Sequence, residues 1–145
     1  MRLPAKQRYA LRIVVNIGCH NGRRPAQKKE IALAESIPAD YVEQICVRLR
    51  AGGIIKSHRG KHGGFSLARD AGKITVSDVM SAIDGHSALA PCMEGECSRT
   101  GICATRRVWE RANAALDDVL SGATIADLVE ESVRLSDSRV ISFEI

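Results

Sequence analysis

Apolar residues recur at steps of three and four over three segments in the first half of the chain, at residues 5–19, 26–35 and 39–51. This spacing places them on one side of a helix and predicts three amphipathic helices. The residues predicted to face inward are Ala10, Ile13, Val14 and Ile17 in the first segment, and Ile31, Leu33 and Ala34 in the second. Ser36, Ile37 and Pro38 predict a tight turn before the third segment.

The third segment separates apolar from polar positions most cleanly. One side of the predicted helix carries Tyr41, Val42, Ile45, Cys46 and Leu49, and the other carries Asp40, Glu43, Gln44, Val47 and Arg48. After Gly52 and Gly53, residues 54–57 and 65–67 predict two short strands around the glycine-rich basic loop 58–64. Helix, helix, turn, helix and hairpin follow in the order of a winged helix-turn-helix.

The second half of the chain predicts a short helix over 75–84, a loop over 85–101 and a longer helix over 104–120. Thr124 is expected to cap a final helical turn through Glu131, and residues 136–145 carry no clear signal. The longer helix has an apolar stripe of Thr105, Val108, Trp109, Ala112, Leu116, Val119 and Leu120. This stripe is longer than a small domain needs, so a partner subunit could cover it.

Composition narrows the class of protein. The chain has 145 residues, about one domain, and only 3% aromatic residues, which favours helices over an all-β barrel. No apolar run approaches the roughly 20 residues that span a bilayer, and the first residues lack the apolar stretch of a secretory signal. The sequence therefore predicts a cytoplasmic protein with no membrane association. It also lacks a paired acid-base set and a nucleotide-binding loop, so we do not expect an enzyme.

Charge is divided unevenly along the chain. Residues 1–70 hold 14 Lys and Arg against 5 Asp and Glu, a net charge of +9, whereas residues 71–145 have a net charge of -5. A basic half is expected of a protein that neutralises DNA phosphates, although scattered surface charge would look similar. The residues predicted to contact double-stranded DNA are Lys28 in the second helix, Asp40, Tyr41, Glu43 and Gln44 in the third, and Arg59, Lys61 and His62 in the loop of the hairpin.

Three cysteines, Cys92, Cys97 and Cys103, lie close together in the loop after the short helix. Thiolates at this spacing can converge on one metal centre, and iron-sulfur clusters are typically bound by cysteine. Zinc sites more often show C-x2-C pairs. A thiol-disulfide sensor is the alternative. The other two cysteines, Cys19 and Cys46, lie in or beside apolar helical stretches and are predicted to be core residues.

These features together resemble the IscR/NsrR-type family of winged-helix iron-sulfur transcription regulators. The resemblance covers residues 1–131 and is carried by Met1-Arg2-Leu3 with Arg8-Tyr9-Ala10, Tyr41-Val42-Glu43-Gln44 with Arg48-Leu49-Arg50, Arg59-Gly60 with Gly63-Gly64-Phe65, and the three cysteines followed by Trp109. It implies a homodimer joined by the long helix, recognition helices in successive major grooves, Arg59 in the minor groove, and a cluster near the dimer interface. It favours [2Fe-2S] over [4Fe-4S].

The chain departs from this family at the fourth cluster ligand. IscR-like members have a histidine three residues after the last cysteine, where this chain has Arg106, and NsrR-like members use a carboxylate of the partner's first helix, where this chain has Arg8. The first cysteine gap is also one residue shorter than in the IscR-like pattern. The candidates left open for the fourth ligand are His86, Glu94, Glu96 and a small exogenous molecule.

We therefore expect a mainly α-helical protein with a small β-hairpin wing. Its expected parts are a winged helix-turn-helix DNA-binding domain (1–84), a cluster-binding loop (85–103), a dimerisation helix with its following turn (104–131) and a tail (132–145). The expected function is sequence-specific transcription regulation that senses iron-sulfur, redox or nitric oxide status, with repression and activation both open. The alternative is a cluster-free regulator that responds through a thiol-disulfide change.

Overall fold

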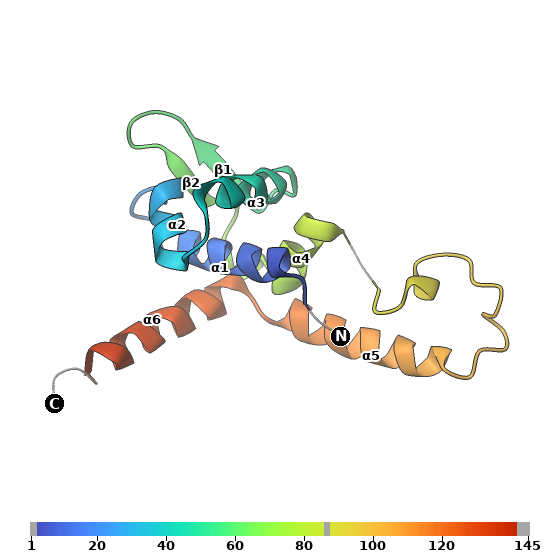
Figure 1. The fold of residues 1–145 in the computed structure, drawn as a ribbon. Coiled ribbons are helices and arrows are strands. Elements are labelled where there is room, and N and C mark those ends of the chain that lie inside the picture. Colours follow the sequence, from blue (N-terminus) through green and yellow to red (C-terminus); the bar gives the residue numbers. More distant parts are fainter. Residues whose placement is uncertain (1–2, 86–87, 142–145) are drawn as a thin grey trace.

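The computed structural model describes residues 3–85 and 88–141. Six α-helices and one antiparallel hairpin follow one another in the chain, with two short 3₁₀ helices between them (Figure 1). Their bounds are α1 Ala5–Cys19, α2 Lys28–Glu35, α3 Ala39–Ala51, β1 Ile55–His58, β2 Gly64–Leu67, η1 Ala71–Lys73, α4 Val76–Asp84, η2 Pro91–Met93, α5 Arg106–Gly122 and α6 Ile125–Ile141. The prediction of a mainly α-helical winged helix-turn-helix is confirmed. None of the described helices is long and apolar enough to cross a membrane.

The core lies around α1, which packs against α2, α3, α4, β2 and α6. All four inward positions predicted for this helix, Ala10, Ile13, Val14 and Ile17, are buried. The inward face predicted for α3 is buried at Val42, Ile45, Cys46 and Leu49, while Tyr41 is partly exposed. Periodicity identified these two faces correctly because each helix packs against the body along its whole length.

The second helix differs from its prediction both in the residue at which it begins and in the residues that it buries. It begins at Lys28, because Ala26 is paired with Phe65 of the hairpin by two backbone hydrogen bonds of 2.8 and 2.9 Å. Ile31 is buried, but Leu33 is 83% exposed and Ala34 is exposed, so the prediction that both face inward is wrong. Ile31 and Leu33 lie about 200° apart on a helix, so one face cannot bury both.

The chain after Gly122 is more helical than its sequence pattern indicated. Thr124 caps α6 as expected, with its hydroxyl accepting from the backbone N–H of Asp127 at 3.2 Å. The helix then continues to Ile141, well beyond the predicted turn through Glu131. Its first turns pack against α1, where a Cβ on Gly18 would lie 2.7 Å from a methyl group of Val129. The later turns extend away from the body (Figure 1), so burial gave them no apolar pattern to detect.

Candidate nucleic-acid interface and cysteine loop

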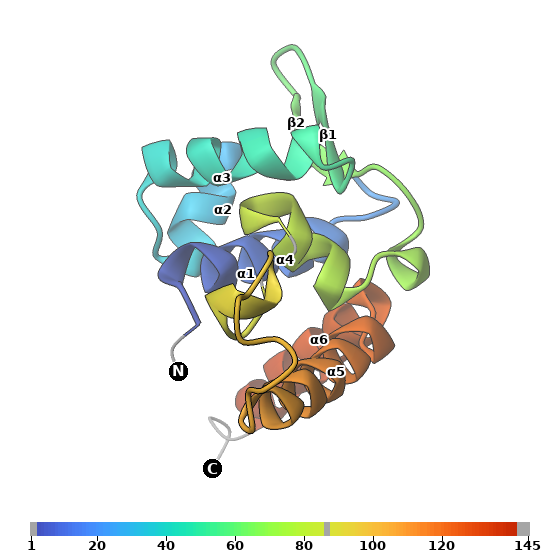
Figure 2. The ribbon, with the colours of Figure 1, turned by 90° about the vertical axis from the view of Figure 1, so that its right-hand side faces the viewer.

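Helices α2 and α3 form the helix-turn-helix. Between them Ser36 adopts a left-handed conformation at φ 54°, which turns the chain, and Ile37 is buried at 3% exposure. The backbone N–H of Ile37 donates to the carbonyl oxygen of Ala32 at 3.0 Å and closes the turn. The second helix of the motif, α3, is therefore fixed to the body through its buried face, and its other face is presented outward (Figure 2).

The exposed face of α3 carries the predicted base-contacting residues Asp40, Glu43 and Gln44. The carboxylate of Glu43 forms an ion pair of 3.1 Å with Lys28 at the start of α2, so two of the predicted DNA contacts are joined in the free protein. Tyr41 packs edge to face on Tyr9 with ring centroids 5.9 Å apart. This contact holds the first turn of α3 against α1.

The wing presents three exposed predicted contacts, Arg59, Lys61 and His62, in the loop between β1 and β2. Gly60 has φ of 102°, and its carbonyl oxygen accepts from the N–H of Gly63 at 3.0 Å. A left-handed backbone conformation at this turn favours glycine, because a Cβ atom would clash sterically there. The turn projects the basic side chains away from the body.

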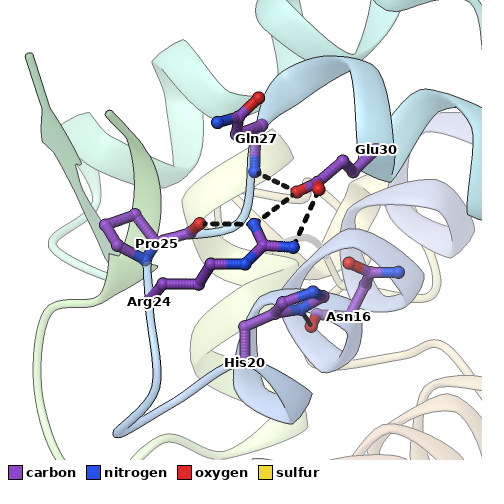
Figure 3. A network of polar contacts seen from close by, with 6 residues as sticks. All are labelled: Asn16, His20, Arg24, Pro25, Gln27 and Glu30. Carbon is purple, nitrogen blue, oxygen red and sulfur yellow. Dashed lines mark hydrogen bonds and ion pairs between the residues drawn. The ribbon is translucent and has the colours of Figure 1, made fainter. Parts of the chain in front are cut away.

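The loop that precedes α2 is fastened to α2 by the polar contacts drawn in Figure 3. The guanidinium of Arg24 makes two hydrogen bonds of 2.8 Å to the carboxylate of Glu30, which also accepts from the backbone N–H of Gln27 at 3.1 Å. The Arg24 hydrogen bond, followed by that of Gln27, lowers the pKa of Glu30 to about 2. Ala26, the residue before Gln27, pairs with Phe65 of the wing. The wing and Lys28 are therefore held in a fixed relation.

The three candidate cluster ligands lie on the segment between α4 and α5, which has no buried residue between positions 88 and 105. Cys92 is exposed, and Cys97 and Cys103 are partly exposed. The hydroxyl of Thr105 lies 3.3 Å from the sulfur of Cys103, and this hydrogen bond is the main reason why the pKa of Cys103 is lowered. In the described part of the chain, no three His, Cys, Asp or Glu side chains form a group that could hold a metal.

The positions considered for a fourth ligand have varied surroundings. Arg106 forms an ion pair of 2.7 Å with Glu110, and Arg8 lies over the ring of Tyr9 at 5.9 Å. The carboxylate of Glu94 accepts from the backbone N–H of Ala88 at 2.7 Å, while Glu96 is exposed. His86 lies outside the described residues.

The two remaining cysteines are separate from this loop. Burial raises the pKa of the Cys46 thiol to about 12, as expected of a core residue, whereas Cys19 is only partly buried. The apolar stripe of α5 is largely open in the single chain: Trp109 is 43% exposed and Val119 is 68% exposed.

Two positions with structural roles were not identified by the sequence pattern. Periodicity places Arg48 on the outward face of α3, yet its guanidinium binds the carbonyl oxygen of Ile83 in α4 at 2.7 Å. Ala26 reads as the first residue of a helix but pairs with the wing. Both contacts join segments that are distant in sequence, and periodicity carries no information about such pairs.

Comparison with known proteins places this fold among transcription regulators. The model of the Rrf2 family, described as an iron-dependent transcriptional regulator, matches residues 3–131. Protein rrf2 of Nitratidesulfovibrio vulgaris is 35% identical over 134 residues, which cover 91% of this chain and 89% of that protein. The regulator IscR of Xenorhabdus nematophila is 33% identical over 131 residues, covering 90% of this chain and 80% of that protein.

A solved structure agrees with these sequence relatives. CymR, the global cysteine regulator of Bacillus subtilis, superposes with a TM-score of 0.79 and 29% identity over 90% of this chain and 98% of that one. These proteins are regulators and not enzymes, as expected for this chain, and the resemblance to IscR-type proteins is confirmed. The chain therefore belongs to the Rrf2 family of DNA-binding transcription regulators.

Proposed function

We propose that this chain regulates transcription as a homodimer whose DNA binding depends on an iron-sulfur cluster held by Cys92, Cys97 and Cys103. The observation that carries the proposal is the position of the three thiols. All three are at least partly exposed, and they lie on the segment between α4 and α5. A regulator that acts on chromosomal DNA works in the cytoplasm, so the proposal places the chain there.

The proposed DNA contacts come from two surfaces that the fold holds together. Asp40, Tyr41, Glu43 and Gln44 on α3 would enter a major groove, with Lys28 at the start of α2 near the backbone. Arg59, Lys61 and His62 of the wing would reach the neighbouring backbone or minor groove. The bridge between Ala26 and Phe65 supports this assignment, because it fixes the spacing between the wing and the helix-turn-helix.

The proposed dimer uses the exposed stripe of α5. Its large apolar side chains, Val108, Trp109, Leu116 and Val119, are between 40% and 68% exposed in the single chain. A contiguous apolar face of this kind on a protein of this size indicates an interface. A second copy would bury it, and it would bring two recognition helices into one complex, as two half-sites on DNA require.

The donor set fits an iron-sulfur group. Thiolates are the ligands that such clusters prefer, and the turns around them are closed by local hydrogen bonds, such as Thr100 N–H to the carbonyl of Cys97 at 3.0 Å. The segment can therefore rearrange to bring the thiols together without loss of core contacts. When bound, the group would supply a centre that responds to iron, oxygen or nitric oxide. The family pattern favours [2Fe-2S].

The test compares Cys97→Ala with Cys46→Ala, which removes a buried thiol of the core. After anaerobic reconstitution, we expect the wild type and Cys46→Ala to contain iron and sulfide, and Cys97→Ala to lose both together with the visible absorbance. Circular dichroism should show that Cys97→Ala is folded, because this residue has no core contacts. The DNA affinity of reconstituted and stripped wild type should differ. Full iron and sulfide in Cys97→Ala, or equal affinity in both states, would contradict the proposal.

A second candidate is a cluster-free thiol switch. A solved structure of CymR from Staphylococcus aureus, 30% identical to this chain, is of an oxidized form, which favours this candidate. The exposure of Cys92 favours it as well. In this case wild-type protein should remain colourless after reconstitution, and diamide should change its DNA affinity reversibly. Iron and sulfide analysis therefore separates the two candidates.

A further inference from the structure

The end of α4 is capped by a side chain of the recognition helix. Arg48, in the last turn of α3, donates from Nη1 to the carbonyl oxygen of Ile83 at 2.7 Å. This carbonyl lies in the last turn of α4, where helix carbonyls have no partner within the helix. A guanidinium there also interacts favourably with the partial negative charge of a helix C-terminus. Arg48 therefore ties α3 to the end of α4.

Close backbone packing supports the same connection. A Cβ on Gly52, which ends α3, would lie only 2.5 Å from the Cβ of Ala82, so the two helices meet there without space for a side chain. From the other side, Lys6 of α1 forms an ion pair of 3.1 Å with Asp84, the last residue of α4. The end of α4 is thus held by both α1 and α3.

The cysteine-containing segment begins directly after this junction. Gly85 has φ of 75° and ends α4. Residues 88–105, which carry the three cysteines, lie between α4 and α5 and lead into α5 (Figure 2). The first part of the segment is anchored to α5, because the backbone N–H of Leu89 donates to the side-chain oxygen of Asn113 at 3.1 Å. The end of α4 is consequently the covalent link between the DNA-reading body and the cysteines.

We propose that Arg48 is a positioning residue that couples the cysteine segment to the recognition helix. A change in the segment that shifts the end of α4 is passed through the Arg48 hydrogen bond to α3. The inference rests on the proposed function, in which α3 reads DNA and the cysteines sense. Coupling between two sites is reciprocal, so DNA bound to α3 must change the state of the cysteines.

The reciprocal effect can be measured in cluster-free, reduced protein. The rate of labelling of Cys92, Cys97 and Cys103 by N-ethylmaleimide is followed by mass spectrometry, with and without a saturating duplex selected from a random pool. Labelling follows the population of the conformation that exposes the thiols, so we expect the duplex to change the wild-type rate by about fivefold or more, the lower end of typical coupling. In Arg48→Gln the change should fall to within about twofold of no effect, while duplex still binds.

Arg50→Gln is the matched control, since it removes the same charge from the same turn of α3. Arg50 donates to the hydroxyl of Ser57 in the wing at 3.4 Å, whereas Arg48 donates to α4. It should keep the wild-type change, and Arg48→Lys, which retains a donor, should restore it. The inference is overturned if saturating duplex leaves the wild-type rate unchanged, if Arg48→Gln keeps the full change, or if Arg50→Gln loses it equally.

The outcome does not depend on the cluster. Absence of iron and sulfide from reconstituted wild type would remove the cluster proposal while leaving the labelling result valid. Loss of coupling only in Arg48→Gln would support the inference in either case. Thermal unfolding of Arg48→Gln and Arg48→Lys shows whether each variant is folded. If Arg48→Gln is unfolded, the test rests on Arg48→Lys. The inference then requires that Arg48→Lys keep the wild-type change in labelling rate.

Discussion

The DNA-reading body and the segment that follows it differ in how they are stabilised. Residues 3–84 contain nearly all of the buried side chains, from Gln7 to Ile83, and each of the α-helices α1 to α4 buries at least one residue. Residues 88–122, with the cysteines and α5, bury none. Helix α5 is nonetheless strongly amphipathic, with Val108, Trp109, Leu116 and Val119 on its apolar side.

This difference indicates that the two parts of the chain have different roles. The body, whose core is completed by Ile125 at the start of α6, holds α3 and the wing in a fixed relation, as reading a groove requires. In the second part, α5 contacts α4, but its apolar face stays largely exposed in the described part of the chain, so full burial of this face requires something outside the chain. Low local stability of this kind is expected where a protein changes conformation in response to a signal. Three predictions test the comparison.

The largest effect is expected from a core truncation. Ile13→Ala in α1, where the side chain is fully buried, should lower the free energy of unfolding by about 2–5 kcal/mol. Leu116→Ala in α5 should lower it by less than about 0.5 kcal/mol, as for exposed positions. Both are measured by urea denaturation in a Val119→Asp background, which removes the contribution of a partner. Similar losses at the two positions would show that α5 has a core of its own.

A second effect is expected on the dimer. Val119→Asp places a charge in the exposed apolar stripe and should raise the dimer dissociation constant at least about tenfold, as for a residue central to an interface. Ala114→Asp, on the opposite side of α5, is the control and should leave the constant within about twofold of the wild type. Analytical ultracentrifugation measures both. Equal dissociation constants for the two variants would argue against this face as the interface.

The smallest effect is expected at the ion pair between Arg24 and Glu30, at the start of α2. Glu30 has its pKa lowered from 4.5 to about 2, so its ion pair with Arg24 contributes stability above pH 4.5 that is lost as pH falls toward 2. Glu30→Gln keeps the cap on Gln27 but removes the charge. At pH 6 its melting temperature should be lower than that of the wild type by at most about 2 °C, since the pair is exposed.

This difference should fade in melting curves recorded between pH 4.5 and 2. Arg24→Gln should behave in the same way, because it removes the other member of the pair. A difference that stays constant down to pH 2 would mean that the ion pair is not its source.

The accuracy with which the sequence predicted buried residues depended on how each helix packs. Ile13 in α1 and Ile45 in α3 were correctly assigned to the core, because both helices bury one continuous face. Leu33 was assigned wrongly, because α2 buries little besides Ile31. The extent of α6 was missed, because residues 131–138 of this helix are not buried. Periodicity reports burial, so it is informative only where burial occurs.

By itself, the sequence determined the local elements and the chemistry of the side chains: amphipathic helices, a glycine-rich basic turn and three neighbouring thiols. It could do so because spacing, turn residues and ligand types act over short stretches of chain. Only the tertiary structure decided that Lys28 pairs with Glu43, that Ala26 joins the wing and that Arg48 caps α4. These contacts form between residues far apart in sequence, and the packing of the helices brings them within hydrogen-bonding distance.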